Sequence, residues 1–384
     1  MGGTKEIPKR ADLVDYNYAV AGHDGTLCDA DGELFIKPCT QQEINFYESA
    51  LNGHPEFSEL MPLFFGQMTL NDMTDMASIN EQLPAVADHI STHMKEEVIR
   101  LAHQLQPDPA KDNIKWVPNK SKKIATNISL VLENAAYGYK RPNILDVKLG
   151  QRLWADDAPL EKKQRFDKIS QETTHGPLGF RIAGMRVYRG SENPEELDEE
   201  DYRIYDKDYG RCTVNKDNVQ DAFRKFIFNE SAGVDEELGK AVARAFMEEV
   251  KHVQEVLENE ESRMYSASLL FVFEGDGDAL RAAIDEASSS VTMSQKGRGE
   301  ASGRSTARVD SGIAMDEATG NMILPEDDDD EDSGDDENVP RIYCVKLIDF
   351  AHAEFTPGQG PDENNLKGVR SLVQIFDELS REDE

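Results

Sequence analysis

The decapeptide RPNILDVKLG, from Arg141 to Gly150, places an acid and a base on the same side of an extended segment. Alternation along a strand puts Asp146 and Lys148 on one face and the neighbouring Leu and Val side chains on the other. A carboxylate and an ammonium side by side, between a proline and a glycine, can hold a hydroxyl nucleophile next to an anionic group. An ordinary surface ion pair would have the same pattern, so the rest of the sequence must decide between these interpretations.

A second lysine, Lys37, ends the predicted strand ELFIKP, and the next segment has a helical pattern that carries Glu43 and Glu48. Either glutamate could face back toward the lysine. A strand lysine paired with a helix glutamate holds nucleotide phosphates in protein-kinase-like sites. A solvated lysine at the end of a strand is the alternative.

A third candidate group follows the apolar segment RIYCVKLIDF, where Asp349 ends a predicted strand and His352 comes soon after. A carboxylate at the end of a strand suits a Mg²⁺ ion on nucleotide phosphates. Elsewhere, His89 and His93 have a spacing that could chelate a metal. No Glu or Cys pattern accompanies them, so we favour solvated histidines on a helix.

The overall charge is strongly acidic, at -33 with 75 Asp and Glu residues in 384. Such a chain repels phosphates, so we expect neither direct nucleic-acid binding nor a general attraction to anionic membranes. The four cysteines form no CxxC pair, which indicates a reducing compartment rather than a zinc site or disulfides. We find no apolar run long enough to span a membrane and no secretory signal.

Residues 140 to 190 reverse this balance, with eleven basic residues against six acidic ones. Part of this excess lies in the predicted helix LEKKQRFDKI, from Leu160 to Ile169. Its basic residues are Lys162, Lys163, Arg165 and Lys168. Three of them recur at about one-turn spacing, which suits the floor of a site for a small polyanionic substrate. A solvated charged helix face is the alternative.

The elements that must position these groups can be outlined from periodicity. We expect a β-hairpin at 16–38, strands at 61–66, 128–133, 179–188 and 265–274, and helices at 80–106, 218–229, 236–258 and 364–379. The buried strand ISLVLE ends at Glu133 to Ala135, like a hinge between two lobes whose backbone receives adenine. The segment 107–123 is an exposed loop that ends in a basic patch, NKSKK, a weak nuclear-import signal.

Periodicity is lost from about residue 283 to 340, where the chain is rich in Ser, Gly and charge. From Glu326 to Glu337, ten of twelve residues are acidic. Such a run cannot bury itself and is expected to be disordered. It is either a solubilising insertion or a contact for a basic partner such as a transcription factor or a histone tail.

Taken together, three motifs resemble the inositol polyphosphate kinase family. Its PxxxDxKxG signature matches Pro142, Asp146, Lys148 and Gly150. Its SLL element matches residues 268–270, and its IDF-A-H element matches residues 348–352. The resemblance extends from the FIKP lysine to the last helix, and it is strongest to the multikinases of fungi.

This resemblance implies an α+β, two-lobed, protein-kinase-like (ATP-grasp-like) fold. We expect an N-terminal lobe at 1–135 and a catalytic lobe at 136–384, which contains a substrate-binding helix segment at 156–174 and the acidic insertion. ATP would be held by Lys37, Glu133, Ala135, Asp146 and Asp349, and Mg²⁺ by Asp349 with Ser268. Asp146, Lys148 and His352 would be catalytic, and Lys148 and the four basic helix residues would bind the substrate.

The expected activity is stepwise phosphorylation of inositol 1,4,5-trisphosphate to tetrakis- and pentakisphosphate, by a monomer in nucleus and cytoplasm. A hexakisphosphate kinase, a trisphosphate 3-kinase and a non-catalytic transcription-factor scaffold are the alternatives. A 3-kinase usually has a larger inserted substrate domain than this chain can hold. The sequence lacks GxGxxG and Walker A motifs, so GHDGT at 22–26 is the one candidate for a phosphate-covering loop.

Overall fold

The computed structural model describes two antiparallel sheets and the helices around them. The described residues are 13–16, 18, 20, 25–69, 128–296, 314–315, 322–323 and 341–381. Several sequence predictions lie outside them: the helix with His89 and His93, the NKSKK segment, most of the GHDGT loop and the acidic run Glu326 to Glu337.

The first sheet has the strand order β1-β2-β3-β5-β4. Its strands are β1 (Val14–Asp15), β2 (Leu27–Cys28), β3 (Leu34–Pro38), β4 (Phe64–Thr69) and β5 (Ile128–Glu133). Alternation in β3 buries Leu34 and Ile36 on one side and leaves Lys37 on the other. The predicted hairpin is confirmed around Gly32, whose φ of 78° suits a glycine turn. The first strand of this hairpin is β2, at Leu27–Cys28, so the hairpin starts later than the expected residue 16.

The second sheet has the order β13-β10-β6-β7-β8, and the signature strand β6 lies at its centre. Its strands are β6 (Pro142–Leu149), β7 (Phe180–Tyr188), β8 (Tyr202–Tyr205), β10 (Ser268–Glu274) and β13 (Tyr343–Ile348). Leu145, Val147 and Leu149 are wholly buried on one face of β6. Asp146 and Lys148 alternate with them on the other face, as the sequence predicted.

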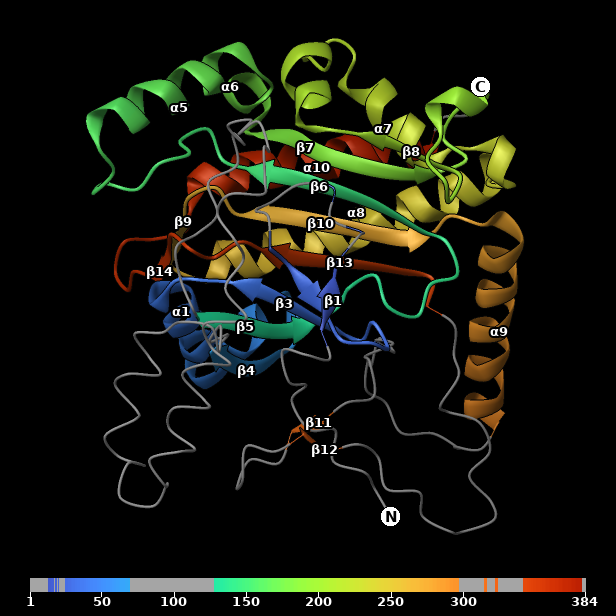
Figure 1. Cartoon of the computed structure of the whole chain (residues 1–384), viewed down its shortest axis with the longest axis horizontal. Helices are drawn as coiled ribbons and strands as arrows, with labels where there is room; N and C mark the ends of the chain where they lie inside the picture. Colours follow the sequence, from blue (N-terminus) through green and yellow to red (C-terminus); the bar gives the residue numbers. More distant parts are fainter. Residues whose placement is uncertain are drawn as a thin grey trace, which may run out of the picture.

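Two long helices, α8 (Glu236–Asn259) and α10 (Glu363–Arg381), cover one face of the second sheet (Figure 1). Phe246 of α8 lies between Phe271 of β10 and Phe376 of α10, with ring centroids 5.2 and 5.5 Å away. The apolar stripe predicted for α8 therefore forms the core that supports β6. None of the described helices is long and apolar enough to cross a membrane.

The helices of the first lobe also pack against the second. They are α1 (Gln41–Gly53) and α2 (Pro55–Glu59). Phe46 of α1 stacks on Phe350 and on Phe355 at centroid distances of 4.9 and 4.8 Å. This aromatic contact fixes α1, and with it Glu43, next to the segment that follows β13.

The remaining elements of the second lobe are α5 (Leu160–Glu172), α6 (His175–Leu178), the π-helical turn η4 (Tyr209–Thr213), α7 (Val219–Ile227), β9 (Ser262–Met264), α9 (Gly277–Lys296), β14 (Ala353–Phe355) and the short turns η3 (Pro194–Glu196) and η5 (Glu230–Ala232). Two further short strands, β11 (Ala314–Met315) and β12 (Met322–Ile323), pair with each other in a separate two-stranded sheet. The loss of periodicity expected from residue 283 is wrong at its start. A helix continues there to Lys296, because Leu280 and Ala283 still bury an apolar edge against the lobe.

Candidate active site

Three elements bring the predicted lysines and acids together between the two sheets. The Lys37 ammonium from β3 donates to Glu43 Oε1 of α1 at 2.9 Å and to Asp349 Oδ1 at 2.6 Å. On the other side of Asp349, Lys148 Nζ lies 3.5 Å from Oδ2. Residues more than 300 positions apart in the sequence thus form one alternating charge cluster. We call Lys37, Glu43, Lys148 and Asp349 the charge cluster.

Backbone contacts fix the charge cluster in place. Glu43 Oε1 also accepts from the Phe350 N–H at 3.2 Å, so α1 grips the residue next to Asp349. Asp349 itself has a φ of 71°, a left-handed conformation that turns its carboxylate out of β13. Lys148 Nζ donates to the Ser266 carbonyl at 2.8 Å. The cluster is therefore held by packing and hydrogen bonds before any ligand arrives.

The electrostatics of Lys37 favour its charged form. Burial alone would lower the pKa of its ammonium, but Asp349 and Glu43 outweigh burial and raise the pKa above its ordinary value. Lys37 is therefore a permanent cation at neutral pH. A fixed cation of this kind suits the binding of phosphate oxygens.

Asp146 lies beside the charge cluster on β6 and is almost wholly buried. Burial raises the pKa of its carboxyl, Asp349 raises it further, and the positive charges of Lys148 and Arg181 oppose the rise. Among the described residues, neither Asp146 Oδ1 nor the buried Ser268 hydroxyl has a hydrogen-bond partner. A buried acceptor with a raised pKa is suited to take a hydrogen bond, and then a proton, from a reacting hydroxyl.

The charge cluster also fits a divalent ion shared with phosphates. No group of three or more His, Cys, Asp or Glu side chains in the described ranges could hold a metal alone. Mg²⁺ commonly binds one or two carboxylates and completes its shell with water and phosphate oxygens. Asp349 meets this requirement, and the unpartnered oxygens of Asp146 and Ser268 lie next to it.

The predicted hinge follows the end of β5. The Glu133 carboxylate accepts from the Leu63 N–H and pairs with Arg341, both at 3.3 Å, so its side chain has a structural role. Ala135 and Ala136 are buried in a small apolar cluster with residues of the second sheet. The backbone at Glu133 and Ala135 thus passes between the lobes, where a hinge is expected.

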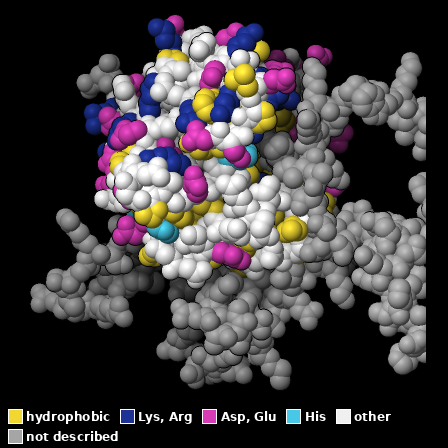
Figure 2. Space-filling view, turned by 90° about the vertical axis from the view of Figure 1, so that its left-hand side faces the viewer, with side chains coloured by type: hydrophobic (Ala, Val, Ile, Leu, Met, Phe, Trp, Pro, Cys, Tyr) yellow, Lys and Arg dark blue, Asp and Glu magenta, His cyan; other side chains and the backbone are white. Residues whose placement is uncertain are grey.

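The basic helix α5 lies on the side of the molecule shown in Figure 2, where Lys and Arg side chains gather in the upper part. One of its four predicted substrate residues reaches the site: Lys162 Nζ is 3.4 Å from His352 Nε2. Burial and the Lys162 charge lower the pKa of His352, which favours the neutral imidazole at neutral pH.

The other three basic residues of α5 point elsewhere. Lys163 donates to the Asp156 carbonyl at 2.7 Å and lies over the Trp154 ring. Lys168 pairs with Glu172 at 3.7 Å along the helix, and Arg165 lies over the Phe166 ring. Their roles toward a substrate stay predictions, as do those of all the site residues.

Sequence reasoning missed Arg181, which faces the same site from β7. Arg181 pairs in register with Lys148, and its guanidinium lies close enough to Asp146 to lower the pKa of that carboxyl. Burial lowers the pKa of Arg181 itself to about 10. Arg181 was counted in the basic stretch, but its place beside Asp146 depends on the register of β6 with β7. This register cannot be derived from the sequence pattern alone.

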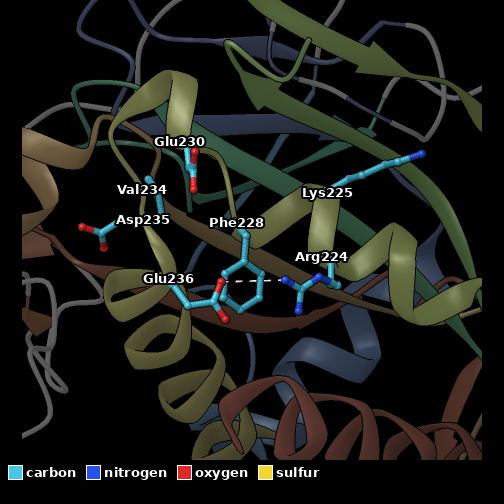
Figure 3. A pocket seen from close by; sticks show the side chains of 7 residues that line it. All are labelled: Arg224, Lys225, Phe228, Glu230, Val234, Asp235 and Glu236. Atoms are coloured by element: carbon cyan, nitrogen blue, oxygen red, sulfur yellow. Dashed lines mark ion pairs between the residues drawn. The ribbon is translucent and has the colours of Figure 1, made fainter. Parts of the chain in front are cut away.

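A separate hollow lies away from the charge cluster, between α7 and the start of α8 (Figure 3). Its volume is about 280 Å³. Arg224 points into it and pairs with Glu236 at 3.8 Å, whereas Lys225 points away. Asp235 caps α8 and pairs with Arg281. Its charges therefore satisfy one another, and nothing links this hollow to the chemistry of the cluster.

Comparison with known proteins agrees with this geometry. The family described as inositol polyphosphate kinase matches residues 129–377, which include β6, β10, β13 and α5. The chain belongs to the inositol polyphosphate kinase family. It is therefore a kinase that transfers phosphate to inositol phosphates, with the two-lobed α+β fold that the sequence predicted.

The similarity of this kinase to the inositol polyphosphate multikinase of Saccharomyces cerevisiae is 30% identity, over 94% of this chain and 96% of that protein. The multikinase of Schizosaccharomyces pombe is 27% identical to this chain, over 67% of this chain and 78% of that protein. A crystal structure of the Saccharomyces cerevisiae inositol phosphate multikinase with ADP and Mn²⁺ matches with a TM-score of 0.55 and 25% identity, over 90% of this chain and 99% of that one.

Proposed function

We propose that this kinase is a multikinase, which uses ATP and Mg²⁺ to phosphorylate inositol 1,4,5-trisphosphate stepwise to tetrakis- and pentakisphosphate. The observation that carries the proposal is the charge cluster beside Asp146, which combines two cations, a metal-binding carboxylate and a buried acceptor. Phosphoryl transfer asks a protein mostly for positioning and charge neutralisation, and this set supplies both.

The roles follow from the positions of the side chains. Lys37 is the fixed cation for ATP phosphates, and the backbone at Glu133 and Ala135 would receive adenine. Asp349, with Ser268 nearby, would hold Mg²⁺, which neutralises phosphate charge when bound. Lys148 lies on the other side of Asp349, where it can stabilise the transferring phosphoryl group and a substrate phosphate.

Asp146 orients the attacking hydroxyl. Its unpartnered Oδ1 can accept the hydrogen bond of an inositol hydroxyl, and the raised pKa of this carboxyl helps it to take the proton as the new P–O bond forms. The same carboxylate could instead contact the ribose of ATP. Lys162 and His352 lie at the substrate end, where Lys162 would meet a substrate phosphate, and Lys163, Arg165 and Lys168 would meet further phosphates only by leaving their present contacts.

Two features favour a multikinase over its neighbours in the family. The relatives that are multikinases include one matched over nearly its whole length, whereas inositol hexakisphosphate kinase 1 of Mus musculus is 26% identical over 52% of its length. Between β6 and β7 the chain contains only the short helices α5 and α6. This compact floor leaves room for inositol phosphates with different phosphate patterns.

Further expectations concern the surroundings of the enzyme. The acidic run Glu326 to Glu337 has the charge to contact a basic transcription-factor partner, which would add a role in transcription. The net charge of -33 argues against direct contact with nucleic acid. We propose a monomer that works in nucleus and cytoplasm.

The deciding experiment is ATP-dependent conversion of inositol 1,4,5-trisphosphate by the purified chain, with the products separated by chromatography and Asp349→Asn as the blank. We expect tetrakis- and then pentakisphosphate, and neither product in the blank. Turnover of the hexakisphosphate to a pyrophosphate, with none of the trisphosphate, would identify a hexakisphosphate kinase. A single tetrakisphosphate product would indicate a 3-kinase, and no turnover of either substrate would indicate a scaffold.

A further inference from the structure

Three of the first described residues of the chain contact both lobes beside the hinge. Tyr16, Tyr18 and Val20 follow β1 and lie outside the residues that match the family. We call these three residues the clasp. The contacts of the clasp divide between the lobes, and each contact is of a kind that fixes orientation.

On the first lobe, the clasp holds the hinge. The Tyr16 hydroxyl donates to Asn134 Oδ1 at 3.1 Å, and the same oxygen accepts from the Ala136 N–H at 3.0 Å. The Tyr16 ring packs edge-on against Phe35 of β3 at a centroid distance of 4.8 Å. Tyr16 therefore links the hinge to β3, the strand that carries Lys37.

On the second lobe, the clasp lies on β7. The Arg186 guanidinium lies over the Tyr18 ring, 5.0 Å from its centroid, and also stacks on Tyr202 at 3.8 Å. Ion pairs with Glu200 and Asp198, at 2.5 and 3.8 Å, keep this guanidinium in place. Tyr18 thus rests on a cation that the second lobe has already fixed.

Gly184 makes the closest approach possible. A Cβ at this position would lie 2.1 Å from the carbonyl oxygen of Val20, a distance that no side chain can occupy. Gly184 pairs in register with Asp146, and Arg186 pairs with Ile144. The clasp therefore crosses the sheet one strand away from the catalytic carboxylate.

Between these two anchor points, the clasp covers the hinge. Tyr18 and Val20 pack against a buried cluster that contains Ala135, Ala136 and Ile144. A nucleotide base held by the hinge backbone would lie against this apolar cluster. We propose that the clasp fixes the two lobes at the spacing that a nucleotide requires, with Tyr18 and Gly184 as positioning residues for ATP.

This inference rests on the proposed use of ATP, and two variants test it. Tyr18→Ala removes the ring on Arg186, and Gly184→Ala displaces the Val20 carbonyl. Each should raise the KM for ATP about fivefold, the effect of one lost cation–π contact. We expect kcat within about twofold and an unchanged KM for the inositol phosphate, because the charge cluster is intact.

The controls separate positioning from general stability. Tyr18→Phe keeps the ring and should match the wild type. Arg203→Ala removes a similar stack, 5.3 Å from the Tyr205 ring on β8, without touching the clasp, and should also match the wild type. Calorimetry with ADP should show a dissociation constant that is larger for Tyr18→Ala and Gly184→Ala than for the wild type, by the same factor as the KM for ATP.

Three results would overturn the inference. An unchanged KM for ATP in Tyr18→Ala would make the clasp a structural contact, and this variant decides the matter if Gly184→Ala does not fold. A lower KM for ATP would show that the segment obstructs the site. A wild-type protein that turns over inositol phosphates without binding adenine nucleotides would overturn the proposed use of ATP and the inference together.

Discussion

The charge cluster is held from several sides, whereas α5 buries little surface and most of its basic side chains contact only their own helix or the loop before it. Lys37 and Lys148 share Asp349, and the Phe46–Phe350 stack presses α1 against the segment that carries it. On α5, by contrast, Ser170 is the buried residue, and Lys168 pairs only along the helix among the contacts described. One region is preorganised and the other can adapt.

This difference assigns different tasks to the two regions. Transfer of a phosphoryl group requires fixed charges at fixed distances, because misplacement by 1 Å can cost about a hundredfold in rate. Recognition of several inositol phosphates requires cations that can move to meet different phosphate patterns, and long exposed side chains do so at little cost in stability. Substitutions in the cluster should therefore change kcat, and substitutions on α5 should change KM.

The largest effect is expected for Lys148→Ala. Removal of this ammonium leaves Asp349 with one cation and takes away the charge that faces the transferring phosphoryl group. We expect kcat to fall by about 10² to 10³, with a small change in melting temperature, because the Lys148 side chain is partly exposed, at 24%. Transfer of radiolabelled phosphate from ATP to the inositol phosphate measures kcat.

The matched control is Lys140→Ala, an exposed lysine just before β6 that pairs with Asp276 at 3.0 Å. It should keep full activity. If the two variants lose the same activity, the cluster has no special role.

The boundary between the two regions gives a pH prediction. His175 begins α6, between α5 and β7, and its Nδ1 donates to the carbonyl of Gly150, which directly follows β6, at 2.7 Å. Burial, helped by Arg181, lowers the pKa of His175 to about 3. The unfolded chain binds a proton below about pH 6.5 and the folded one does not, so stability falls as the pH drops from 6.5 toward 3, by up to about 1.4 kcal/mol per pH unit.

Urea unfolding at pH 7, 6 and 5 tests this dependence against His175→Asn, whose amide can still donate to the Gly150 carbonyl but does not titrate. The variant should lose less stability than the wild type over this range. Carboxylates contribute equally to both proteins and cancel in the difference. Parallel curves would show that His175 does not titrate in the way that its burial requires.

A smaller effect is expected for Lys162→Ala on α5. Lys162 reaches His352, so we expect it to meet a substrate phosphate. Its removal should raise the KM for the inositol phosphate about tenfold, the value of one charge-assisted hydrogen bond, with the KM for ATP unchanged. Steady-state kinetics with each substrate varied in turn measures both constants.

Lys168→Ala is its partner variant, with a side chain 73% exposed and paired to Glu172. Its KM should stay within about twofold of the wild type, as for a surface ion pair. A larger rise in KM for Lys168→Ala than for Lys162→Ala would show that α5 presents its Lys168 side, and not its Lys162 side, to the substrate.

The same contrast explains what the sequence could and could not predict. Strict alternation placed Asp146 and Lys148 on one face of β6, and a strand that leads directly into a helix predicted that Lys37 would face Glu43 or Glu48, of which the structure selects Glu43. These are local consequences of geometry. The place of Arg181 beside Asp146 depends on the register of β6 with β7, and this register shifts by one residue between Asp146 and Val147. No local pattern encodes such a shift.

The helix α5 shows the opposite limit. Its existence followed from periodicity, but its direction toward the site did not, because a polar helix with little buried surface can present several faces. The clasp was missed for a third reason. Residues 16–38 were predicted as a β-hairpin, but Tyr16, Tyr18 and Val20 belong to no strand, and the close approach at Gly184 joins segments more than 160 positions apart in the sequence.

The smallest effect is expected from deletion of Glu326 to Glu337, which removes ten negative charges from a chain of -33. Exposed charges are screened within about 8 Å at physiological salt, so kcat should be unchanged. The KM for the polyanionic substrate should fall slightly, by less than about twofold, and only at low salt, because a general repulsion is removed. A large loss of kcat would place the acidic run at the charge cluster and would end the distinction between a fixed catalytic centre and an adaptable surface.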